Sequence, residues 1–359
     1  MGEDTSKASR SFLKWLGAVM APVLLVLAAT AVYIEPPTGV LTMLGGYAER
    51  DFGWNSTQVA ADPGRTREHA RYQAGHDMLV LGDSFSVGGV WQAYLRARSG
   101  YSSLTLDVNA TDLERVLGTD AYRAAPPKLV VLQAVELFML DRFARMDRPC
   151  AIGGERSAVR TAAWPAPGAM QLPQIERPRS SSLGNLNLKY ALLYLQREFQ
   201  RTMFGTDGSL VLRYRLARAD LFSNRRSDEI LVYAPDLAKL DWPRERLRAG
   251  ACHIRALQDR VESDGTTAFL FLLVPDKSTA YAEFLLGAPF HPVPAAVEAL
   301  VAAGVHLAPL DGLLRRAIHA GERDVYLPND THFGARGFEL AAEAVAAQLS
   351  ARVTGAQRK

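Results

Sequence analysis

Two short segments, far apart in the chain, carry the residues that could do chemistry. One is Gly82-Asp83-Ser84-Phe85-Ser86 and the other is Asn329-Asp330-Thr331-His332-Phe333. In an extended turn the side chains at i and i+2 share a face, so Asp330 can accept from one ring nitrogen of His332 while the other reaches a distant hydroxyl. The pattern predicts a triad in which Ser84 attacks, His332 removes and returns the proton, and Asp330 fixes the imidazole tautomer and stabilises the imidazolium.

Five short apolar runs predict the strands that would position these residues. They cover residues 76–81, 104–108, 129–134, 268–274 and 305–310. Each run is followed by a segment that could be helical, which predicts a three-layer α/β/α sandwich around a mostly parallel, five-stranded sheet. Ser84 then lies in a strand-to-helix turn at the carboxyl edge, where open α/β sheets bind ligands and its backbone N–H can point at an oxyanion. Asp83 is a candidate for the pocket beside Ser84, although an Asp at this position most often caps the following helix.

The strand and helix pattern breaks between about residues 143 and 249. Several prolines and a Ser180-Ser181-Ser182 run predict a long insertion that contains one helix, from about Asn187 to Phe204. That helix could cover the sheet or form a lid.

The predicted organisation is a cytoplasmic N-terminus at 1–14, a membrane anchor at 15–34, a stalk and lead-in at 35–75, and a catalytic domain at 76–355.

The N-terminal region predicts a membrane helix. Lys7, Arg10 and Lys14 precede an uncharged apolar run from Trp15 to Ile34, and twenty residues of helix match the hydrocarbon core of a bilayer. Because the basic residues come before the run, the N-terminus is expected in the cytoplasm and the rest of the chain outside it, in the periplasm of an inner-membrane protein. The alternative is a cleaved signal peptide ending near Ala29-Thr30-Ala31, which would leave a soluble periplasmic protein.

Composition excludes several classes of protein. The chain has 359 residues, of which 48% are hydrophobic and 22% charged, so it is neither disordered nor collagen-like. A net charge of +3, with scattered Lys and Arg, does not fit a nucleic-acid binder. No metal or cofactor site is predicted, because the remaining histidines lack ligand spacing with Cys or carboxylates. These are His69, His76, His253, His291, His306 and His319.

The chain has two cysteines, Cys150 and Cys252, and neither lies in a CxxC or Cys/His motif. An oxidising compartment outside the cytoplasm would permit a disulfide between them. The alternative is a pair of unrelated buried thiols.

The two chemical segments resemble those of the SGNH, or GDSL, hydrolase superfamily. They are most similar to its periplasmic acetyltransferase-like branch, which includes alginate O-acetyltransferases and partners of membrane-bound O-acyltransferases. In that branch a GDSFS block and a tight Asp-Thr-His-aromatic spacing replace the wider Asp-x-x-His-Pro of ordinary esterases. The resemblance covers about residues 74–145 and 255–350 and implies an SGNH-like, flavodoxin-like fold.

A third similarity concerns substrate binding. Val274-Pro275-Asp276-Lys277, followed by Tyr281, is similar to a Pro-x-Lys-x-x-x-Tyr stretch of this branch. Lys277 and Tyr281 could bind an acidic or hydroxyl-rich sugar chain. The alternative is a solvated loop lysine and a packed tyrosine.

Two departures from the family pattern bear on the reaction. Ser84 precedes the Asp-x-His pair, whereas in the alginate enzymes the pair comes first, so alginate is not assigned as substrate. Glu136 stands where SGNH hydrolases carry an oxyanion-hole Asn, and a carboxylate cannot donate to an oxyanion. The second donor could then be Asn109, which could instead form a local turn. Glu136 could organise the pocket, or pair with Arg142 or another base.

The resemblance implies an O-acetyltransferase that modifies hydroxyls of an exported polysaccharide through a Ser84 acyl-enzyme. Its acetyl donor would be a multi-pass membrane O-acyltransferase, since acetyl-CoA is cytoplasmic. Two alternatives remain: an extracytoplasmic carbohydrate esterase, in which water deacylates the serine, or a catalytically silent subunit of an exopolysaccharide assembly complex.

Overall fold

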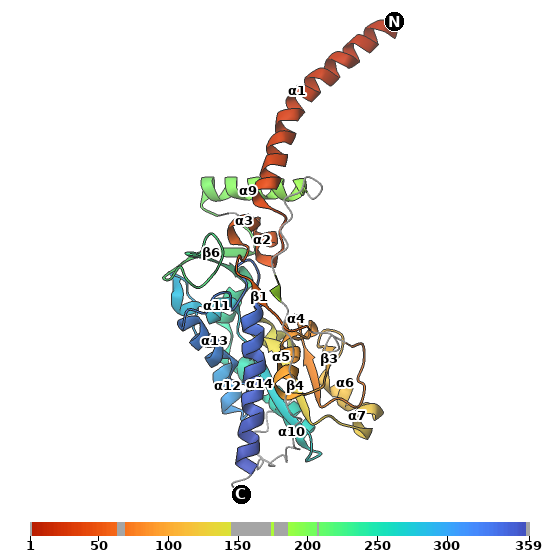
Figure 1. The fold of residues 1–359 in the computed structure, drawn as a ribbon, viewed down its shortest axis with the longest axis vertical. Coiled ribbons are helices and arrows are strands. Elements are labelled where there is room, and N and C mark those ends of the chain that lie inside the picture. The colour runs from red at the N-terminus through yellow and green to blue at the C-terminus, as the bar shows by residue number, and fades with distance from the viewer. Residues whose placement is uncertain (1, 63–68, 145–173, 176–185, 207, 357–359) are drawn as a thin grey trace.

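The computed structural model describes residues 2–62, 69–144, 174–175, 186–206 and 208–356. It has a compact body from which one long helix, α1 (Gly2–Ile34), projects (Figure 1). Within α1, Ser9–Ile34 has a mean hydropathy of 2.2 over its most apolar part and is long enough to cross a membrane. Near the N-terminus, such a helix is suited to be a membrane anchor or a signal sequence.

The central sheet has four parallel strands in the order β3-β2-β4-β8. They are β2 (Met78–Gly82), β3 (Ser103–Asp107), β4 (Leu129–Val135) and β8 (Ala268–Val274). The predicted α/β fold with a parallel sheet is therefore confirmed. The fifth predicted strand is reduced to a single parallel bridge between Leu307 and Phe271, held by hydrogen bonds of Phe271 N to His306 O and of Ala308 N to Phe271 O.

Helices cover both faces of this sheet, and β2 shows how the sequence divides between them. Met78 and Val80 pack into the core under α5, α13 and α14, whereas Leu79 and Leu81 pack into the core under α6, α10 and α12. Alternate side chains of a strand point to opposite faces, so a strand covered on both sides is apolar throughout. The helices are α5 (Val90–Ser99), α6 (Leu113–Leu117), α10 (Arg244–Glu262), α12 (Val297–Ala302), α13 (Leu310–His319) and α14 (Ala335–Ala356).

The strand order places β2 at the switch point of the sheet. The chain goes from β2 to β3 on one side and then crosses to β4 on the other. Crevices at the carboxyl ends of such strands are the usual ligand sites of open α/β sheets. The short helix α4 (Ser84–Val87) begins there, directly after β2.

A second, antiparallel sheet has the order β7-β6-β9. Its strands are β6 (Val211–Leu216), β7 (Glu229–Tyr233) and β9 (Leu285–Leu286). The first two lie in the predicted insertion, but the third comes from after β8, so this segment is built into the body. The sequence pattern did not predict this sheet, because its strands are short and β6 alternates buried with exposed residues.

The remaining elements are short connections, apart from α9, which crosses the base of α1 (Figure 1). They are α2 (Val40–Gly45), α3 (Glu49–Phe52), β1 (Gln58–Val59), α7 (Asp120–Ala124), α8 (Met139–Phe143), β5 (Gln174–Ile175), α9 (Leu188–Phe204) and α11 (Lys277–Ala280), with 3₁₀ turns at Glu136–Phe138, Ala234–Asp241 and Ala282–Phe284.

The start of the predicted stalk packs against the body instead of standing free. In α2, the backbone N–H groups of Leu41 and Thr42 donate to the carbonyl oxygen of Asn329 at 3.0 and 3.3 Å. The buried Glu49 accepts from the Asn329 side-chain amide at 2.6 Å and from Thr42 Oγ1 at 2.6 Å. The segment after α1 therefore holds the loop between α13 and α14.

Gly39 shows how close this packing is, and it yields a stability prediction. A Cβ at this position would overlap the backbone carbonyl and the side chain of Asn329. Because φ is −100°, steric overlap and not backbone strain would be the cause of any effect. We expect Gly39→Ala to lower the free energy of unfolding by about 1–3 kcal/mol, measured by thermal or denaturant unfolding.

Gly88→Ala is the matched control. Its φ is −65° and its Cβ would meet no atom nearer than 3.8 Å. Equal stability of the two variants would contradict the packing of α2 on the Asn329 loop.

Candidate active site

Ser84, His332 and Asp330 form a continuous chain of hydrogen bonds at the carboxyl edge of the sheet. His332 Nε2 lies 2.8 Å from Ser84 Oγ, and His332 Nδ1 lies 2.7 Å from Asp330 Oδ1. The Ser84 side chain is exposed, so a substrate can reach it, whereas Asp330 is 9% exposed. In such an arrangement a serine can act as nucleophile, a histidine as its base and a carboxylate as the group that orients the base.

Local sequence explains how each group is placed. Ser84 is the first residue of α4, and Asp83 before it caps the helix by accepting from Phe85 N at 3.2 Å. Asp330 Oδ1 also accepts from the backbone N–H of His332 at 3.0 Å, which closes a tight turn around the pair. The His332 ring packs on Phe85, with ring centroids 4.8 Å apart. Because Phe85 directly follows Ser84, this contact positions the His332 ring beside Ser84.

The second oxygen of Asp330 has a partner from the other end of the chain. Val40 N, at the start of α2, donates to Asp330 Oδ2 at 2.9 Å. Burial raises the pKa of Asp330, but the hydrogen bond and charge of His332 and the Val40 N–H outweigh it and hold the pKa at about 2. Asp330 therefore stays ionised at neutral pH and can stabilise a protonated His332. The sequence did not predict that Val40 and Glu49 support this loop, because they lie about 280 residues from it.

Asp83 lies at the centre of a buried hydrogen-bond network beside Ser84. Besides the cap, its carboxylate accepts from Gln133 Nε2 at 2.9 Å, from Val135 N at 3.0 Å and from Arg142 at 2.7 Å. Gln133 Oε1 in turn accepts from Asp83 N at 3.0 Å. The end of β4 is thereby fixed to the turn that carries Ser84. Sequence reasoning missed Gln133 in this role.

Asn109 is part of the same network. Its Nδ2 donates to Asp107 at 2.8 Å and its Oδ1 accepts from Arg142 at 3.1 Å, which leaves one amide hydrogen for another acceptor. Its backbone N–H also donates to Asp107, at 2.8 Å, so Asn109 forms a local turn. The Ser84 N–H lies in the first turn of α4, where backbone N–H groups have no acceptor within the helix. It has no hydrogen-bond partner among the residues described.

Glu136 faces away from this network, into a buried polar cluster. It accepts from Thr279 Oγ1 at 2.7 Å and from Asp276 N at 3.1 Å, and it pairs with Lys239 Nζ at 3.4 Å. Its basic partner is therefore Lys239, and Arg142 pairs with Asp83. Burial raises the pKa of Asp276 well above its usual value, with the charge of Asp236 adding to this effect. Three acidic side chains, Glu136, Asp236 and Asp276, therefore lie close to the single ammonium group of Lys239.

Lys277 and Tyr281 lie in the interior, which corrects their expected role in substrate binding. Lys277 is 3% exposed and Tyr281 is 0% exposed. Lys277 Nζ donates to the carbonyl oxygens of Leu327 and Pro328 at 2.8 Å and of Asp330 at 3.2 Å. Burial lowers its pKa to about 7, while the charge of Asp330 opposes this. Residue type alone does not reveal that a loop folds over this lysine. The three hydrogen bonds of Lys277 Nζ hold the loop that carries Asp330.

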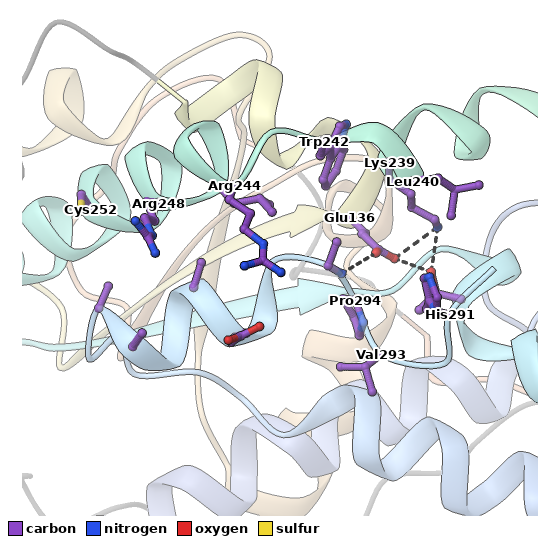
Figure 2. A pocket seen from close by; sticks show the side chains of 17 residues that line it. Glu136, Lys239, Leu240, Trp242, Arg244, Arg248, Cys252, His291, Val293 and Pro294 are labelled. Carbon is purple, nitrogen blue, oxygen red and sulfur yellow. Dashed lines mark hydrogen bonds and ion pairs between the residues drawn. The ribbon is translucent and has the colours of Figure 1, made fainter. Parts of the chain in front are cut away.

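A separate pocket of about 780 Å³ opens beside Glu136 (Figure 2). Trp242, Arg244 and His291 line it together with apolar side chains from α10 and α12, and its lining includes neither Ser84 nor His332. Such a lining suits a ligand with both apolar and polar or anionic groups.

Cys252 also lines this pocket and is disulfide-bonded, whereas Cys150 lies outside the described residues. Within the described part of the chain, no cluster of His, Cys, Asp and Glu could hold a metal ion.

The parallel α/β sheet and the hydrogen-bonded Ser84, His332 and Asp330 fit the resemblance to SGNH-type proteins. Comparison with known families confirms the resemblance: the model for the SGNH hydrolase-like domain of the acetyltransferase AlgX matches residues 233–359. No curated protein and no solved structure matches the chain. The matched region includes Asp330 and His332 and ends beyond them, and it supports an acyltransferase-like or esterase-like activity.

The role of His332 is testable with a fluorophosphonate probe, which labels activated serines. Because His332 Nε2 is the hydrogen-bond partner of Ser84 Oγ, we expect His332→Ala to slow labelling roughly 10²–10⁴-fold. Ser84→Ala should abolish labelling. The control is His319→Ala, since His319 is a half-exposed histidine paired with Glu283 away from the site. Labelling of the His332→Ala protein at the control rate would contradict the triad.

The positioning role of Lys277 gives a second prediction. Lys277→Met leaves three carbonyl oxygens of the Asp330 loop without their donor. Each buried carbonyl oxygen left without a hydrogen bond lowers the free energy of unfolding by on the order of 1–3 kcal/mol. We expect a lower melting temperature and slower labelling of Ser84. Lys128→Met, which removes a half-exposed ion pair with Asp77, is the control. Unchanged labelling and stability in Lys277→Met would show that Lys277 does not hold the Asp330 loop in place.

Proposed function

We propose that this protein is an O-acetyltransferase that transfers an acetyl group to a hydroxyl of an exported polysaccharide through an acyl-enzyme on Ser84. The observation that carries the proposal is the hydrogen-bonded chain from Ser84 through His332 to Asp330. The similarity to an SGNH hydrolase-like acetyltransferase domain supports the choice of acetyl transfer.

The reaction has two half-steps. Ser84 Oγ attacks the acetyl carbonyl while its proton passes to His332 Nε2, and His332 returns that proton to the leaving oxygen of the donor. An acceptor hydroxyl then gives its proton to His332 and attacks the acyl-enzyme, and His332 reprotonates Ser84 as the bond breaks. The Asp330 carboxylate, with its pKa of about 2, stabilises the imidazolium in both steps.

The developing oxyanion needs donors near Ser84. The Ser84 N–H at the start of α4 is the first, and the remaining amide hydrogen of Asn109 is the second candidate. Arg142 bridges Asp83 and Asn109 and would position both. Glu136 takes no part in this step, because its carboxylate faces Lys239 and Thr279.

The membrane helix supports a proposal for location and donor. With basic residues before the apolar part of α1, the body would lie outside the cytoplasm, anchored in the inner membrane. Acetyl-CoA does not reach that side, so a multi-pass membrane O-acyltransferase would supply the acetyl group.

Hydrolysis is the second candidate, and the exposure of the site favours it. Ser84 is exposed and the His332 side chain is 32% exposed, so water can reach an acyl-enzyme. Transfer then requires that a bound sugar hydroxyl outcompete water.

The test uses the full-length protein in detergent, an activated acetyl ester, and neutral and acidic oligosaccharides, followed by mass spectrometry of the sugars. We expect acetylated sugar that is lost in Ser84→Ala. Ser84-dependent acetate release without acetylated sugar would replace transfer with esterase activity. Absence of both products, together with absence of fluorophosphonate labelling, would indicate a catalytically silent subunit.

A further inference from the structure

The helix α9 (Leu188–Phe204) has one apolar face that nothing in the described structure covers. Large apolar side chains recur along it at the spacing of one helical face, i, i+4, i+11 and i+15. These are Leu188, Leu192, Phe199 and Met203, and their exposed fractions are 38%, 57%, 60% and 61%. Four large exposed apolar side chains in one stripe are unusual on a surface that meets only water.

The opposite face of α9 fixes the helix to the body. Tyr190 is 4% exposed, and its hydroxyl lies 2.7 Å from Thr42 O and 2.6 Å from Tyr47 O. The guanidinium of Arg201 stacks 3.7 Å from the Tyr47 ring and donates to the carbonyl oxygen of Gly46 at 3.3 Å. These contacts hold the exposed stripe so that it faces away from the body.

The position of α9 along α1 indicates what lies on that side. Leu27, Ala31 and Ile34 of α1 pack against Tyr190 and Ala191 of α9. All three belong to the segment that is long and apolar enough to cross a membrane. From Leu27 to Ile34 the helix rises about 10 Å, which is the thickness of a helix lying on its side. Figure 1 shows α9 running across α1 where α1 leaves the body.

A cation–π contact between Tyr33 and Arg50 lies at the same level along α1. Tyr33, in the last turn of α1, is 47% exposed, and the Arg50 guanidinium lies 4.9 Å from its ring. Tyrosine and arginine with apolar bodies and polar ends are typical of the boundary between acyl chains and headgroups.

We propose that α9 is an interfacial helix whose apolar stripe inserts into the lipid bilayer crossed by α1. Insertion would bury Leu188, Leu192, Phe199 and Met203 among acyl chains about 5–10 Å below the headgroups. The contacts of Tyr190 and Arg201 would then set the orientation of the whole body on the membrane. Since α2 lies between α9 and the Asp330 loop, the catalytic edge would be held at a fixed distance from the lipid surface. The contacts of α9 with α1, Thr42 and Tyr47 differ from the expectation that the helix covers the sheet. The proposal rests on the proposed membrane anchoring of α1 and not on the proposed acetyl transfer.

The experiment places a tryptophan on the stripe and measures its contact with lipid. Full-length Phe199→Trp is reconstituted in phosphatidylcholine bilayers whose acyl chains carry bromine near the headgroup end, a quencher of tryptophan fluorescence. Val301→Trp is the matched control, because Val301 is 62% exposed but lies on α12, which Figure 1 shows well away from α9. Leu192→Trp is a second probe of the same face. The fluorescence of the unsubstituted protein is subtracted in each case.

We expect brominated lipid to quench roughly half of the emission added by Phe199→Trp and Leu192→Trp, and almost none of that added by Val301→Trp. Equal quenching at positions 199 and 301 would overturn the proposal. A photo-crosslinking residue at position 199 that reacts in native membranes with another protein and not with lipid would overturn it as well, and would assign the stripe to a protein partner.

Discussion

The buried carboxylate of Asp330 is the constraint on which the site depends. One oxygen accepts from His332 and the other from Val40 N, so this single side chain joins the base to the segment that follows α1. An ionised carboxylate that is 9% exposed requires such partners, because an unpaired buried charge costs several kcal/mol. Lys277 Nζ donates to the backbone carbonyl oxygen of Asp330 and so helps to hold the loop that carries the carboxylate. Catalytic geometry and folding are therefore coupled at one residue.

Local pattern predicted the strands, the position of Ser84 after β2 and the Asp330–His332 pair, because each of these depends on short-range signals. The apolar run before Gly82 is long enough for a strand covered on both faces, and Ser84 follows it at the edge where such sheets bind ligands. The two-residue spacing of Asp330 and His332 determines that they can contact each other. The run at residues 305–310 forms a single bridge with β8, between Leu307 and Phe271.

Long-range burial could not be predicted in the same way. Lys277 and Glu136 carry charges that usually mark a surface or a site, and their partners lie in loops and in the predicted insertion, as Lys239 does for Glu136. Val40 lies in a segment whose composition fits a stalk, yet it contacts Asp330, 290 residues away. A single sequence does not show which distant backbone N–H will meet a given carboxylate.

The central claim is that His332 and Asp330 make Ser84 a nucleophile. The most direct measurement is rapid acid quenching after mixing with an activated acetyl ester, followed by peptide mass spectrometry of the trapped protein. The account predicts one acetyl group on the peptide that contains Ser84, carried by Ser84 itself, and lost when a hydroxyl acceptor is added. Turnover of the ester with no acetylated Ser84, or acetylation that is unchanged in His332→Ala, would contradict it.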